Sequence, residues 1–301
     1  MTTDPATSAV PGASAWRPSE RQQERDAYRR GRTRRSFAVA AVSTVALAAV
    51  AVAGLVSSPG WPRVKASFLD PEVARASLPA VLDGLWLNVR VMAVSAVVIV
   101  VVALLLALAR TLPGPVFFPV RALATAYVDV FRGLPLILVL LLVGFGLPGL
   151  RLTGVPTSAV VLGGLALVLT YSAYVAEVFR AGIESVHPSQ VAAARALGLS
   201  RGQSLRHVVL PQAVRRVVPP LLNDLVALSK DSGLISILGA IDAVRAAQIE
   251  TARYANFTPY VVAGLLFVAL TIPLTRLTDA LARRSGWLGA QSAATGGGAA
   301  R

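Results

Sequence analysis

The sequence contains no cysteine and only two histidines, His187 and His207. Without thiols the chain can build neither a disulfide framework nor a thiolate metal site. The two histidines are 20 residues apart, whereas the ligands of metal sites recur at intervals of a few residues. We therefore expect no metal and no cofactor. A Gly-Lys-Ser/Thr phosphate loop is also missing, so the chain itself does not bind ATP by that route.

Charge is scarce as well, since only 15% of the residues are charged and 55% are hydrophobic. The mean hydropathy of +0.64 is too apolar for an ordinary soluble domain. Basic residues number 29 against 15 acidic ones, which gives a net charge of +14. Such an excess fits nucleic acid, a membrane surface, or the cytoplasmic loops of a membrane protein. The positions of the charges decide between these classes.

Long apolar runs dominate the chain. A membrane-spanning helix needs roughly 20 largely apolar residues, and every backbone group in lipid must be paired internally. Five long runs are free of charged residues: 37–62, 91–108, 133–150, 152–176 and 254–275. A sixth run, 217–241, is interrupted by Asp224, Lys230 and Asp231, and we count it as a span. We therefore predict an all-α polytopic membrane protein with about six transmembrane helices.

The arginines follow the positive-inside bias. With the N-terminus inside, the cytoplasmic segments are 1–36, about 109–122, about 178–216 and the C-terminal tail. The first of these holds eight arginines and the third holds six. The positive-inside bias of the cytoplasmic segments thus explains most of the excess of basic residues. We predict a multi-pass protein of the bacterial plasma membrane, surrounded by lipid, with both termini in the cytoplasm and no nucleic-acid partner.

The composition divides the chain into four parts. We predict a disordered basic N-terminus over 1–36, an additional first transmembrane helix over 37–62, a transport domain over 80–284, and a flexible tail over 285–301. A twin-arginine pair before an apolar run, Arg34-Arg35, also resembles an export signal. The length of the run favours a retained helix, and the alternative of cleavage stays open.

One cytoplasmic segment reads as two short helices around a tight turn. Pro188 starts the first helix, Gly198 stops it, Ser200 caps the next helix, and Pro211 ends the second. A DNA-binding helix-turn-helix has this outline. Here, however, both ends of the segment are tethered to membrane spans, so docking into a partner protein is the better interpretation.

The spacing of small residues within this segment adds a resemblance. Ala193-Ala194, then Gly198 after three residues, then Val208 and Leu210-Pro211, resembles the EAA loop of ABC importer permeases. Three further segments match in order: YVDVFRGLPLILVL at 127–140, YSAYVAEVFRAGIESV at 171–186 and LLNDLVALSKDSGLIS at 221–236. The chain is similar to the polar amino acid uptake branch, the histidine/glutamine permease type, with its MetI-like fold.

The resemblance implies a permease subunit that imports a polar amino acid and performs no covalent chemistry. Its implied partners are ATP-binding cassette ATPase subunits, an extracytoplasmic amino-acid-binding protein and a second permease subunit, in a homo- or heterodimer. It also implies a set of ATPase-coupling residues: Ala192, Ala193, Ala194, Arg195, Gly198, Arg201, Leu210 and Pro211. Ala192 stands where the family has a glutamate, so a salt bridge or cap from that carboxylate cannot form.

Charged residues inside the spans are candidates for the translocation path or a gate, because burying charge in lipid is costly. Asp224 and Asp231 are seven residues apart and share a helix face. Glu177 and Arg180 are three apart and can pair. Structural pairing is the alternative role for all of them. The candidates are Arg132, Glu177, Asp224, Lys230 and Asp231.

Two other functions remain open from the sequence. An ion-coupled secondary transporter could use Glu177, Asp224 and Asp231 as ion ligands, but the loop at 189–211 would then have no task. A membrane-tethered DNA-binding regulator would use the paired helices, with Arg201 and Arg206 on phosphates. The sequence favours the ABC importer permease and does not name the amino acid.

Overall fold

The computed structural model describes residues 19–284, and every regular element in this range is helical. The predictions for residues 1–18 and for the tail 285–301 lie outside the described residues. The chain forms two compact units, which divide between Arg63 and Val64.

The first unit contains one long helix, α1 (Glu20–Val56). Its part Ser36–Val56 is apolar and long enough to cross a membrane. Residues 20–36, which were expected to be unstructured, are helical and continue the span. The reason is their content of Glu, Gln, Arg and Ala, which are good helix formers and extend a helix already nucleated by the apolar run.

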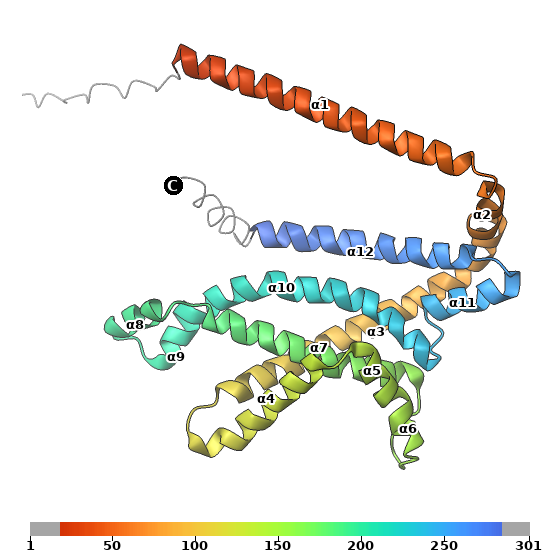
Figure 1. Cartoon of the computed structure of the whole chain (residues 1–301). Helices are drawn as coiled ribbons and strands as arrows, with labels where there is room; N and C mark the ends of the chain where they lie inside the picture. The colour runs from red at the N-terminus through yellow and green to blue at the C-terminus, as the bar shows by residue number, and fades with distance from the viewer. Residues whose placement is uncertain (1–18, 285–301) are drawn as a thin grey trace, which may run out of the picture. The chain divides into compact units, whose positions relative to one another are not determined.

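The helices after α1 belong to the second unit (Figure 1), except that α2 straddles the division between the two units. They are α2 (Trp61–Phe68), α3 (Pro71–Thr111), α4 (Phe118–Gly133), α5 (Leu136–Leu141), α6 (Leu147–Gly149), α7 (Ala159–Glu184), α8 (Pro188–Ala196), α9 (Arg201–Ser204), α10 (Leu210–Asp231), α11 (Ala243–Tyr254) and α12 (Thr258–Arg284). Short 3-10 or π-helical turns precede α4, follow α5, precede α10 and follow α10.

The number of spans agrees with the prediction, but one set of boundaries does not. Residues 19–284 contain four helices that can cross a membrane, or up to six if two bent pairs are each one span. The third predicted span, 133–150, is only the second half of a pair that begins at Pro115 and bends by 107°. Pro135 causes the break, because the residue before a proline avoids helical angles, and Leu134 is extended. Arg121, Asp129 and Arg132 hid the first half from a search for charge-free runs.

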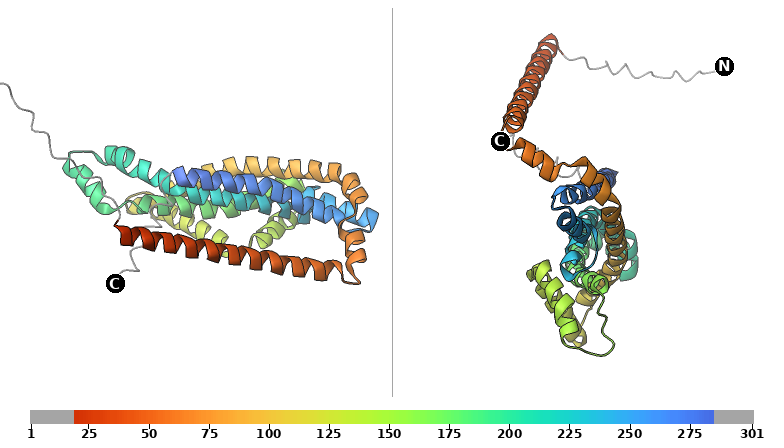
Figure 2. Two further views of the ribbon diagram at one scale, coloured as in Figure 1. Left: turned by 90° about the horizontal axis from the view of Figure 1, so that it is seen from above. Right: turned by 90° about the vertical axis from the view of Figure 1, so that its right-hand side faces the viewer.

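The core forms where α3, α7 and α10 pack against one another (Figure 2). Fully buried side chains such as Leu167 and Ile235 fill this contact. Glycines let the backbones approach, as is usual between helices in membranes. Between α7 and α10, for example, a Cβ atom on Gly182 would overlap the Val217 side chain and lie 3.4 Å from the backbone carbonyl oxygen of Ala213. Within this unit α8 and α9 lie at one end and α11 at the other (Figure 1).

A buried polar tie joins α3 to α11. The Asn88 side-chain amide donates to Asp242 at 3.0 Å, and Asn88 Oδ1 accepts the Ala243 N–H at 3.0 Å. Asp242 also caps α11 by accepting the Arg245 N–H at 2.9 Å. Both side chains are fully buried. One helical turn before Asn88, Gly84 lies against the backbone of Asp242. The contact between α3 and α11 therefore requires both the side-chain amide of Asn88 and a residue without a side chain at position 84.

This contact predicts the effect of Gly84→Ala. The new Cβ would lie 2.4 Å from the backbone carbonyl carbon of Asp242, so α3 and α11 must separate. Overpacking of this kind costs about 1–3 kcal/mol. We expect a lower thermal unfolding midpoint for the purified protein in nanodiscs. Gly264→Ala is the matched control, because a Cβ there meets nothing within 4 Å. Equal midpoints for the two variants would contradict the close contact.

Candidate coupling loop and transmembrane cavity

The first helix of the loop between α7 and α10 begins and ends where the sequence predicts. The His187 ring nitrogen Nδ1 accepts the Ser189 N–H at 3.3 Å, and Pro188 is the first helical residue. At the other end Gly198 has a φ of +84°, in the left-handed region. The Leu199 N–H then bonds to the Ala194 carbonyl at 3.2 Å, which closes the helix in the manner of a Schellman motif.

The second helix begins at the predicted cap. The Gln203 N–H donates to Ser200 Oγ at 3.2 Å, and the Ser200 N–H donates to Gln203 Oε1 at 2.8 Å. This reciprocal pair is a capping box. Arg201, one of the predicted coupling residues, is the first residue of α9. Both ends of the turn between α8 and α9 are thus fixed by hydrogen bonds.

The prediction that Pro211 ends the second helix is wrong. The chain is helical without interruption from Arg201 to Asp231. A π-helical turn, Leu205–Val209, lets the Leu210 N–H reach the Leu205 carbonyl, and Pro211 falls in the first turn of α10. Proline is tolerated there because its missing N–H is not needed. The Gln212 side chain also donates to the Val208 carbonyl at 3.0 Å.

Most predicted coupling residues lie on the surface of the loop. Ala194 is the exception, since it is buried and packs within the loop. Two exposed apolar residues of the loop were not predicted: Leu197, which is 84% exposed at the turn, and Leu205, which is half exposed. The available signal was a leucine directly before Gly198, the residue predicted to stop the first helix. The exposed predicted residues are Ala192, Ala193, Arg195, Gly198, Leu210 and Pro211.

A cluster of charges ties three helices at the end where this loop begins. Glu177 on α7 accepts hydrogen bonds from Arg110 of α3 at 3.0 Å and from Arg180 at 2.5 Å. Arg132 of α4 lies 3.9 Å from the same carboxylate. The predicted Glu177–Arg180 pair is confirmed. Arg110 was missed, although it directly follows an apolar run and therefore lies near the same membrane edge.

The loop is also tied to the helices on both sides of it. Arg180 pairs with Glu184 at the end of α7. Arg216 of α10 donates to the backbone carbonyl of Ser185, the residue after α7. These contacts join the start of the loop to the helix that follows it. The start of the loop is therefore held to both of the helices that flank it.

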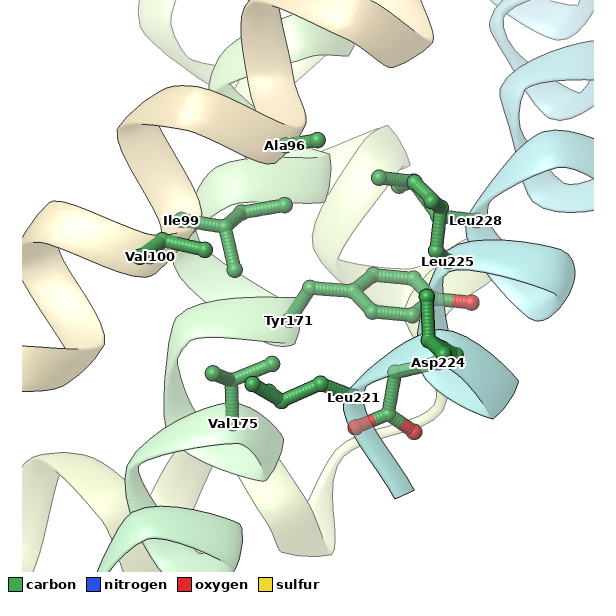
Figure 3. A pocket seen from close by; sticks show the side chains of 10 residues that line it. Ala96, Ile99, Val100, Tyr171, Val175, Leu221, Asp224, Leu225 and Leu228 are labelled. Carbon is green, nitrogen blue, oxygen red and sulfur yellow. The ribbon is translucent and has the colours of Figure 1, made fainter. Parts of the chain in front are cut away.

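A cavity of 180 Å³ lies deeper in the helices (Figure 3). Apolar side chains of α3, α7 and α10 form most of its wall, with two polar residues, Tyr171 and Asp224. Asp224 Oδ2 is buried and has no hydrogen-bond partner among the described residues. Tyr171 donates its hydroxyl to Asp231 at 2.8 Å. The Asp224 carboxylate is thus unsatisfied within the wall, while the surface that the wall presents to the cavity is apolar.

The predicted path residues on α10 separate into three situations. Asp224 lines the cavity, Asp231 is paired with α7, and Lys230 is exposed. Among residues 19–284, Lys230 makes no ion pair with either acid. The described part of the chain also contains no group of three or more His, Cys, Asp or Glu that could hold a metal ion.

Comparisons with known proteins agree on one family. Residues 99–286 match the model of the binding-protein-dependent transport system inner membrane component. The arginine transport system permease protein ArtQ of Bacillus subtilis is 34% identical over 217 residues, which cover 72% of this chain and 97% of that protein. The probable glutamine ABC transporter permease protein GlnM of the same bacterium is 38% identical over 172 residues, which cover 56% and 77%.

Solved structures agree with this assignment. A crystal structure of an amino acid ABC transporter with histidines superposes with a TM-score of 0.63 at 32% identity, covering 68% of this chain and 94% of that one. A methionine ABC transporter, MetNI, shares the fold at 22% identity and a TM-score of 0.53. The chain therefore belongs to the binding-protein-dependent transport system inner membrane components, and it is a multi-pass permease subunit of an ABC transporter.

Proposed function

We propose that the chain is one permease of a pair that imports a polar amino acid. Two cytoplasmic ATPase subunits drive the pair, and an extracytoplasmic amino-acid-binding protein delivers the solute. The names of the relatives, which are permeases for arginine, glutamine and glutamate, support the class of solute. The observation that carries the proposal is the loop of α8 and α9, whose turn is capped by hydrogen bonds on both sides and exposes Leu197.

The loop has the properties of a docking element. Leu197 is 84% exposed at the turn, and Arg195 lies two residues before it. Burial of one leucine in a cleft is worth about 1.5–3 kcal/mol. The Schellman closure at Gly198 and the capping box at Ser200 hold the tip in one shape. Binding to the ATPase then needs little ordering of the loop, and a displacement of the ATPase moves the tip as a unit.

The continuous helix gives this displacement a route to the cavity. The helix that starts at Arg201 runs through α10 and carries Asp224 and Asp231. The Glu177 cluster fixes the inner ends of α3, α4 and α7. A tilt of α10 against α7 therefore changes the distance between Asp224 and the α7 wall of the cavity. We infer that this is the alternating-access movement, with Asp224 on the translocation path and the Glu177 cluster as the gate.

The distribution of arginine supports a cytoplasmic location for the loop. Because the chain has no cysteine, single cysteines can report this directly. We expect Gln190→Cys, in α8, to react with a membrane-impermeant thiol reagent only after cells are opened. Thr153→Cys, between α6 and α7, is expected to react in intact cells. The reverse pattern would contradict the orientation and the cytoplasmic placement of both termini.

Uptake by reconstituted complexes tests the function. The permeases and ATPases are placed in proteoliposomes, and ATP-driven uptake of labelled amino acids is measured with the binding protein present. We expect uptake to require ATP and to persist when ionophores collapse ion gradients. Uptake that instead follows an ion gradient and ignores ATP would favour the secondary transporter.

The same assay tests the loop through Gly198→Ala. A non-glycine residue in the left-handed region costs about 1–2 kcal/mol, which is a factor of roughly 5–30 in a conformational equilibrium. We expect ATP-driven uptake to fall by about that factor while the protein stays in the membrane. Gly202→Ala is the control, because Gly202 lies in helix α9 with open space around it. Equal uptake by the two variants would show that the shape of the loop plays no part in coupling.

The cavity makes a separate prediction for Asp224→Asn. A hydrogen bond to a charged group is worth about 1.5–3 kcal/mol, so losing the charge should lower apparent solute affinity roughly tenfold or more. Thermal stability should stay equal or rise, since an unsatisfied buried carboxylate is removed. Asp129→Asn, at an exposed position on α4, is the control. Unchanged uptake with raised stability would exclude Asp224 from the path.

A further inference from the structure

A second and larger cavity lies between α3 and α11, at the opposite end of the unit from the loop of α8 and α9. Its volume is 400 Å³. In contrast to the first cavity, it is lined by charges of both signs, Asp83 and Arg90 from α3 and Glu250 from α11. Leu87 and Ile249 supply apolar wall. Neither the coupling loop nor the first cavity accounts for this arrangement.

Glu250 is the least satisfied of these groups. The residue is only 8% exposed, and its Oε2 atom is buried without a hydrogen-bond partner among the described residues. Its other oxygen lies 3.7 Å from the Arg253 guanidinium, which is largely exposed. A buried carboxylate oxygen without a donor is costly. Because Glu250 also lines the cavity, a shift of its side chain would bring this oxygen to an ammonium or other cationic donor bound there.

Arg90 supplies the opposite charge at the exposed side of the same cavity. Asp83, Leu87 and Arg90 follow the i, i+4, i+7 spacing and so share one face of α3. Asp83 and Arg90 are about 10 Å apart along the helix axis. In the described part of the chain neither of them forms an ion pair with the other or with Glu250. Both signs therefore remain available to a ligand.

The depth of Arg90 places the cavity near a membrane surface. Arg90 precedes Thr111, the inner end of α3, by 21 residues. At 1.5 Å per residue this is about 30 Å, the thickness of the hydrocarbon core. Arg90 then lies near the outer hydrocarbon boundary, and Asp83 lies beyond it. A solute released outside can reach this cavity before it reaches the one at Asp224.

We propose that this cavity, named the outer site, binds the zwitterionic part of a free α-amino acid before it enters the translocation path. Arg90 binds the carboxylate, and Glu250 with Asp83 binds the ammonium group. Leu87 and Ile249 contact the aliphatic part of the side chain. The choice of an amino acid rests on the proposed function. A zwitterionic lipid headgroup carries the same two charges, so the test separates the two sources.

The test measures binding to permease–ATPase complexes in phosphatidylglycerol nanodiscs. The probes are L-glutamine and L-arginine, each compared with its methyl ester, which lacks the carboxylate. All variants are made in the Asp224→Asn background, so that the first cavity contributes less. We expect Arg90→Gln to weaken binding of the free amino acids ~10-fold and to abolish their advantage over the esters. Glu250→Gln should weaken acids and esters alike by a similar factor.

Two matched controls accompany these variants. Arg75→Gln and Glu72→Gln change an exposed arginine and an exposed glutamate of α3, both outside the cavity. Both should bind as the background does. If Arg90→Gln and Glu250→Gln also behave as the controls while the wild type imports amino acids, the outer site is wrong and the proposed function stands.

Two further outcomes also overturn the proposal. If the wild-type complex neither binds nor imports an amino acid, both the outer site and the proposed function fail. The same measurement is repeated in nanodiscs that contain phosphatidylethanolamine, to test whether the cavity binds a lipid headgroup instead. If Arg90→Gln and Glu250→Gln change only the amount of retained phosphatidylethanolamine, the cavity is a lipid site.

Discussion

The ion pairs of the Glu177 carboxylate are the interactions on which the helix ends beside the loop of α8 and α9 depend. The carboxylate accepts from Arg110 and Arg180 and lies close to Arg132, so that α3, α4 and α7 meet at one negative charge. Charged groups near lipid persist only when they are paired. Removing this one carboxylate would leave two partly buried guanidinium groups, Arg110 and Arg180, without this partner, which is far more costly than losing an exposed pair.

The loop of α8 and α9 is held in position by this cluster. Glu184 ends α7 two turns after Glu177 and is held by Arg180, which also belongs to the cluster. Arg216 then connects the first residue beyond α7 to α10. The loop thus starts from a fixed point and returns into a helix that is itself tied to that point. Its internal caps only need to define the tip.

Sequence patterns that involve only neighbouring residues were sufficient to predict the loop, but they could not predict the contacts between helices. Gly198 and Ser200 act through backbone geometry and near neighbours, so their roles could be predicted from the sequence. The tie between Asn88 and Asp242 joins residues more than 150 positions apart, and no periodicity in one chain reveals such a partner. The break at Pro135 had a local signal, but the charges of α4 concealed the helix before it.

The prediction that Pro211 ends a helix was wrong for a different reason. At Pro211 the π-helical turn before the proline removes the need for its missing N–H, so the helix continues. The same residue type breaks the chain at Pro135, where the preceding Leu134 becomes extended. Since α10 also continues through Pro219 and Pro220, a proline does not by itself mark the end of a helix.

The two cavities place different demands on the helices that line them. The outer site is bounded by α3 and α11, which the Asn88–Asp242 tie and the contact at Gly84 lock together. The cavity at Asp224 is bounded partly by α10, and among residues 19–284 no side-chain hydrogen bond or ion pair joins α10 to α3. Any displacement of α10 against α3 must then be absorbed between Asp231 and Asp242. That segment is a 3-10 helix followed by Gly239 at a φ of +90°, and the helices on either side of it are already bent by 53°. The fold can therefore keep the outer site in shape while the inner cavity changes.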